Sequence, residues 1–109
     1  MPRLLKDFPA TEPGAVGLYA IDFAQNVPVG ASLAAASWTL GIHDTLPGAS
    51  ADATPQARAI GNATVNGTLT SQKIAGLVAG NDYLVTVAGT MSDGEVVVLW
   101  TVLPCRAPS

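Results

Sequence analysis

Short segments in which apolar and polar residues alternate recur along this chain, and turn-forming residues separate them. The first begins at residue 18, and later ones are expected at residues 33–43, 58–65, 68–74, 83–91 and 95–103. A period of two is typical of strands that cover a core with one face, and turns about 8–12 residues apart are typical of a β-sandwich. Because no segment has a convincing helical period, the pattern predicts an all-β sandwich.

A hairpin is predicted at Asn66-Gly67, which lies between two of these segments. Asn-Gly is the strongest short hairpin signal, because both residues tolerate the positive φ angles of a type I′ turn. The residues 58–65 and 68–74 are therefore expected to pair as antiparallel neighbours.

A second local motif places Leu77 and Tyr83 on either side of a glycine turn at the start of a strand. This arrangement resembles the tyrosine corner of fibronectin type III and immunoglobulin-like domains, where the phenol bonds back to nearby backbone. We therefore expect an immunoglobulin/fibronectin III-like β-sandwich of about seven strands. Its fold-defining core is predicted to contain Tyr19, Ile21, Phe23, Trp38, Leu77 and Tyr83.

The chain divides into three parts by composition. Residues 1–14 hold three prolines and no periodicity, which predicts an extended N-terminal arm. The sandwich is expected over residues 15–105, with a loop at 44–57, and residues 106–109 form a short tail.

Composition excludes several classes of function. The net charge of −3, with no cluster of lysine or arginine, argues against nucleic-acid binding. One cysteine and one histidine cannot make an internal disulfide or a structural zinc site. Early charged residues argue against a signal peptide, and no apolar run is long enough to cross a bilayer. We expect a soluble domain made inside the cell, with no cofactor, metal or membrane partner.

Four places in the sequence hold reactive side chains. His43 beside Asp44 suggests a general base, but neighbouring residues of a strand point to opposite faces, so a surface histidine is expected. Cys105 is expected to be a small buried hydrophobe that closes the sandwich. The acids at Asp82 and around Asp93 are too sparse for calcium and are expected to form turns. We predict no catalytic residues and no enzyme.

The last strand is unusual because both of its faces are apolar. One face carries Val96, Val98, Trp100 and Val102, and the other carries Val97, Leu99, Thr101 and Leu103. A sandwich strand is normally apolar on one side only, so the second side must be covered by the N-terminal arm or by another chain. The residues expected to contact a partner are Leu4, Leu5, Phe8, Val97, Leu99 and Leu103.

Short motifs that extend roughly from residue 4 to residue 103, except in the alanine-rich loop, resemble a known pattern. The early ones are Glu12-Pro13, Tyr19-Ala20-Ile21-Asp22-Phe23, Val29-Gly30 and Ser37-Trp38-Thr39-Leu40. The later ones are Gly67-Thr68, Ser71-Gln72, Gly76-Leu77, Gly80, Tyr83, Thr90 and Ser92-Asp93-Gly94. Together they resemble the phage fibre–tail adaptor family, small proteins from the structural gene clusters of tailed phages and prophages. Phe23 stands where that pattern more often has tryptophan.

The resemblance implies a non-enzymatic virion protein, made in the bacterial host cytoplasm, that acts as an adaptor at the neck, tail or fibre attachment. Its implied partners are portal, neck, tail or fibre proteins and further copies of itself in a ring. The alternative is an immunoglobulin-like capsid or tail decoration domain that binds host-surface glycans. Sugar sites usually present exposed aromatics beside polar groups, and here mainly Trp100 and Phe8 are expected to lie outside the core, which makes glycan binding the weaker hypothesis.

Overall fold

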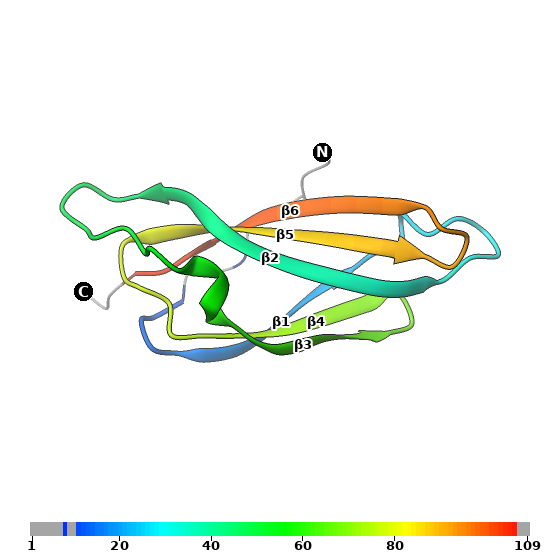
Figure 1. Cartoon of the computed structure of the whole chain (residues 1–109), viewed down its shortest axis with the longest axis horizontal. Coiled ribbons are helices and arrows are strands. Elements are labelled where there is room, and N and C mark those ends of the chain that lie inside the picture. The colour runs from blue at the N-terminus through cyan, green and yellow to red at the C-terminus, as the bar shows by residue number, and fades with distance from the viewer. Residues whose placement is uncertain (1–7, 9–10, 107–109) are drawn as a thin grey trace.

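Two three-stranded antiparallel sheets face each other in the computed structural model, which describes Phe8 and residues 11–106. The first has the order β1–β4–β3, with bounds Val16–Asp22, Leu69–Ala75 and Ala59–Asn66. The second has the order β2–β5–β6, with bounds Leu33–Thr45, Asn81–Met91 and Val96–Pro104. Figure 1 shows the two layers, with β2, β5 and β6 above β1, β4 and β3. The predicted all-β sandwich is confirmed.

The strand order is that of an immunoglobulin constant-type sandwich, in which strands B, E and D oppose strands C, F and G. The predicted loop at 44–57 connects β2 to β3 and ends in a 3₁₀ turn, η1, at Pro55–Arg58. Beside β6, Thr11 forms an isolated parallel bridge to Cys105, in the position of a further strand. Hydrogen bonding extends to Arg106, one residue past the predicted sandwich boundary.

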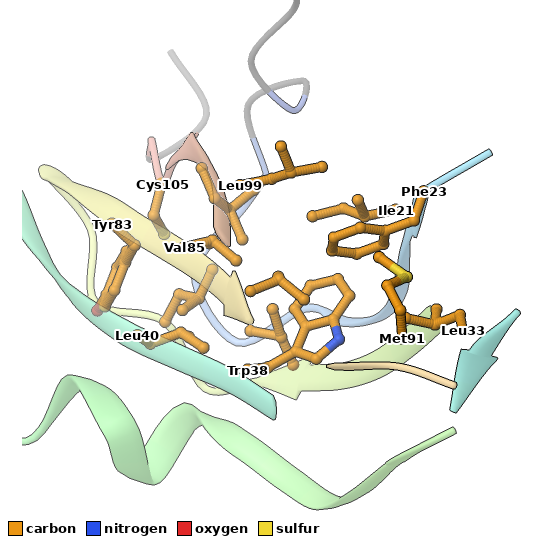
Figure 2. Packing of buried hydrophobic residues seen from close by; sticks show 14 residues of the cluster. Ile21, Phe23, Leu33, Trp38, Leu40, Tyr83, Val85, Met91, Leu99 and Cys105 are labelled. Atoms are coloured by element: carbon orange, nitrogen blue, oxygen red, sulfur yellow. The ribbon is translucent and has the colours of Figure 1, made fainter. Parts of the chain in front are cut away.

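The core lies between the sheets (Figure 2). Five of the six predicted core residues are buried there: Ile21, Phe23, Trp38, Leu77 and Tyr83. Tyr19, which faces the same way on edge strand β1 as the buried Ile21, differs from the prediction: its ring is only half-buried and packs against Phe8. The indole N–H of Trp38 donates a hydrogen bond to the hydroxyl of Thr70 at 3.1 Å, which joins the two sheets through the core.

The β3–β4 hairpin forms as predicted, but its turn differs. Asn66 pairs with Leu69, so the two loop residues are Gly67 and Thr68 rather than Asn66 and Gly67. Gly67 has φ of 65°, and no residue other than glycine has positive φ among the described residues. Positive φ at the first loop position only is the pattern of a type II′ turn, so the predicted type I′ turn is wrong.

The predicted tyrosine corner is present at the start of β5. The backbone N–H of Val78 donates to the phenolic oxygen of Tyr83 at 2.8 Å, while Leu77 is buried beside it. This bond fixes the chain as it crosses from β4 to β5 and so connects one sheet to the other.

Candidate functional site

The side of strand β6 that is expected to contact a partner faces the core, and the opposite side faces solvent. Leu99 and Leu103 lie opposite β5 residues that point inward, and both are buried in the core. Figure 2 shows Leu99 among the core side chains. Val97 is half-buried and packs against the same cluster. The prediction that Leu99 and Leu103 contact another chain is therefore wrong, because the register with β5 points them into the sandwich, whereas contact by Val97 stays a prediction.

The outward side of β6 belongs to a sheet face that is uncharged along four of its rows, whereas the next row, Asp44–Asp82–Pro104, carries two carboxylates. Val96 is 57% exposed, and Val98 and Trp100 are half-buried. Pairing with β5 and β2 continues each of these positions across the sheet in a row of outward residues. The rows, starting from β2, are Ala35–Thr90–Val96, Ser37–Ala88–Val98, Thr39–Thr86–Trp100 and Gly41–Leu84–Val102. None of these side chains is charged, so this neutral outer face loses little hydration free energy when another molecule covers it.

The described part of the predicted arm is bound to the edge of the same sheet. The N–H of Phe8 donates to the carbonyl of Val102 at 3.1 Å, and the N–H of Thr11 donates to the carbonyl of Pro104 at 2.9 Å. The Phe8 ring lies 5.1 Å from that of Tyr19, between centroids. The arm thus covers one end of β6 within the chain and leaves Val96 exposed. Of the other predicted arm contacts, Leu4 and Leu5 lie outside the described residues.

The outer face of the other sheet carries a second exposed apolar patch, which sequence reasoning missed. Leu18 is 74% exposed and Val16 is 63% exposed, both on β1, and Ile60 on β3 is 43% exposed. Between them on β4 stands Lys73, which pairs in register with Leu18 on one side and Ile60 on the other. The available signal was the β1 alternation itself: once Tyr19 faces inward, Leu18 must face outward.

A buried ionic network supports the tyrosine corner and was also missed. The Arg58 guanidinium donates two hydrogen bonds to the Asp52 carboxylate, at 2.9 and 3.0 Å, and the Tyr83 hydroxyl donates a third at 2.7 Å. Arg58 holds the pKa of the Asp52 carboxyl well below its usual range, and burial raises the pKa of the Tyr83 phenol to about 12. At neutral pH both groups are held in one protonation state, which suits a structural clamp rather than acid–base chemistry.

The reactive side chains singled out in the sequence do not form a catalytic group. His43 is exposed, with its ring 6.3 Å from that of Trp100, while the Asp44 carboxylate accepts the N–H of Thr45. Cys105 is fully buried, and this burial raises the pKa of its thiol, so it is not a ready nucleophile.

The acidic residues considered for calcium have other partners. Asp93 accepts the N–H of Glu95 at 3.0 Å and forms the β5–β6 turn, and Asp82 forms an ion pair with Arg106. Within residues 11–106 and at Phe8, no group of three metal-ligating side chains comes together. The same part of the chain has no helix with the length and hydropathy needed to span a bilayer.

A depression of about 300 Å³ opens between β2 and β3, at the side of the sandwich. The Gln56 side chain accepts the N–H of Leu40 there, and the Gln72 side chain donates to the carbonyl of Ile60. The lining residues include no ionisable side chain, so the depression offers no acid or base for catalysis. Gln72 instead satisfies backbone groups where β3 breaks its pairing with β4, and Gln56 satisfies backbone groups of β2.

No family model matches this chain, and no curated protein matches it. The resemblance to phage fibre–tail adaptors therefore stays a prediction.

Proposed function

We propose that this chain is a non-enzymatic structural protein of a phage-like particle, an adaptor at the neck, tail or fibre attachment. The observation that carries the proposal is the neutral outer face that includes Val96, Val98 and Trp100. Soluble domains usually carry about twice the 12% of charged residues found in this chain. A neutral, partly apolar sheet face of this kind favours a role in which neighbouring proteins cover it.

The N-terminal arm supplies the second contact in this proposal. Phe8 and Thr11 anchor the arm along β6, next to the neutral outer face. Leu4 and Leu5 precede this anchor, and we assign them to contact with a neighbouring virion protein or a further copy of the chain. Apolar side chains carried on an anchored arm bind a neighbour at a lower entropic cost than side chains on a free one.

Deletion of residues 2–6 tests the arm, because it retains the Phe8 and Thr11 anchors. The truncated chain is expected to keep the wild-type unfolding midpoint and to be absent from purified particles. A matched control is Phe8→Ala in the full chain, which removes a ring that packs on Tyr19 and lowers the unfolding midpoint instead. A truncated chain that enters particles at the wild-type level would contradict the role assigned to the arm.

A second candidate function is glycan binding by a decoration domain, which the Trp100–His43 pair favours. These rings lie 6.3 Å apart on the outer side of the β2–β5–β6 sheet, and exposed aromatics beside polar groups suit sugar recognition. Trp100→Ala separates the two functions. Particles that retain the chain but lose adhesion to host cells would favour glycan binding, whereas loss of the chain from particles favours the adaptor.

A further inference from the structure

The outer face of the β1–β4–β3 sheet carries one cation, Lys73, while the Asp22 carboxylate at the far end of β1 is bonded to the Thr68 hydroxyl. Arg58 and Arg106 are held in ion pairs with Asp52 and Asp82, whereas Lys73 forms no ion pair among the described residues. Lys73 is exposed and stands on the β1–β4–β3 face between Leu18 and Ile60. This apolar patch with a cation at its centre, formed by Leu18, Ile60 and Lys73, is called the cationic patch below.

The opposite face ends in an acidic turn. Asp93 and Glu95 are exposed in the β5–β6 turn, directly before Val96, which is the most exposed of the described valines in β6. The backbone N–H of Glu95 is bonded to the Asp93 carboxylate, so the turn holds both acids close together. We call Asp93, Glu95 and Val96 the acidic patch.

We propose that copies of this chain associate face to opposite face, with the cationic patch of one copy against the acidic patch of the next. This inference rests on the proposed function and names the surfaces through which the copies meet. Each contact buries Leu18 and Ile60 of one copy against Val96 of its neighbour, and it places Lys73 beside two carboxylates. The burial supplies affinity, and the opposite charges set the register of the two sheets.

Repulsion between like charges argues against contact between two cationic patches or between two acidic patches. Two cationic patches related by a two-fold axis would bring both Lys73 ammonium groups toward that axis, which costs free energy. Because the two patches lie on opposite sheets of one chain, each copy can bind a neighbour on both sides. Such heterologous contacts generate a ring if the rotation between copies closes, or a filament if it does not.

The test is sedimentation velocity of the full-length wild-type chain and charge-reversal variants over a range of concentrations. Lys73→Glu and Glu95→Lys are each expected to weaken self-association roughly 3- to 10-fold, as expected when an exposed attractive pair becomes repulsive. An equimolar mixture of these two variants should associate more strongly than either variant alone, because junctions between unlike variants again join opposite charges at positions 73 and 95. Asp44→Lys reverses an acid at the other end of β2 and should leave association unchanged.

Three results would overturn the inference. One is a wild-type chain that stays monomeric at millimolar concentration. Another is a mixture of the two variants that associates no better than either alone. The third is a mixture of Lys73→Glu with wild type that associates more strongly than wild type, which would show the cationic patch pairing with itself. Failure of the proposed function is seen separately, as absence of the wild-type chain from particles.

Discussion

Replacing Tyr83 by phenylalanine isolates the free energy held in the tyrosine corner. The phenolic oxygen accepts the N–H of Val78 at 2.8 Å and donates to the Asp52 carboxylate at 2.7 Å, and the ring is fully buried. Phenylalanine keeps the ring and removes both bonds. A bond to a charged group contributes about 1.5–3 kcal/mol and a neutral one about 1 kcal/mol, so Tyr83→Phe should lower the unfolding free energy by about 2–4 kcal/mol.

Urea denaturation at pH 7 measures this loss of unfolding free energy. The slope of the unfolding free energy against urea concentration should be the same for Tyr83→Phe and wild type, which shows that the same structure unfolds in both. Tyr19→Phe is the matched control, because the half-buried phenol of Tyr19 can exchange its hydrogen bonds with water. That control should remain within about 0.5 kcal/mol of wild type. A Tyr83→Phe variant as stable as the control would refute the argument that these two bonds hold the corner.

Three further predictions follow from packing and charge. Gly89→Ala should cost roughly 1–3 kcal/mol of unfolding free energy, because the added methyl would lie 2.8 Å from the Phe23 ring, whereas Gly41→Ala meets open space and should be neutral by the same denaturation assay. Leu103→Ala should cost about 2–5 kcal/mol, while the exposed Val96→Ala should leave the unfolding free energy unchanged and weaken self-association in sedimentation. Since the pKa of Asp52 is lowered by folding, its stabilisation is complete above the unfolded pKa of about 4 and is lost as pH falls below it. Denaturation curves from pH 7 to pH 2 should show this loss in wild type and a shallower one in Asp52→Asn.

Where apolar and polar residues alternate clearly, the sequence predicts the strands and most of the core residues. Each of three buried residues lies on a predicted strand face whose other residues are also apolar, so the period of two predicts its burial: Ile21, Phe23 and Trp38. Alternation predicts which way a side chain faces but not how completely it is covered. Tyr19 faces inward as predicted but is half-buried, whereas Ile21 on the same edge strand is buried.

The two faces of β6 could not be distinguished by hydropathy, since both are apolar. Its orientation is set instead by the hairpin with β5, which pairs Val96 with Thr90 and therefore places Leu99 and Leu103 on the core side. One residue of difference in that register exchanges the two faces. Without that register, hydropathy alone predicts the contact residues Leu99 and Leu103 on the wrong side of the strand.

The ionic network beneath the tyrosine corner left no local signal. Asp52 lies 31 residues before Tyr83 in an irregular loop, and only the fold brings them together. Arg58 shares that loop, but nothing in the spacing of these residues distinguishes a buried pair from two solvated charges. Long-range polar contacts of this kind require the three-dimensional arrangement of the strands.

Quantitative mass spectrometry of purified particles from the source strain tests the central claim most directly. The account predicts that the chain is present at a small, fixed number of copies per particle, as closed ring symmetry requires. A copy number in the hundreds would move the chain to capsid decoration. Absence of the chain from particles would contradict the structural role itself.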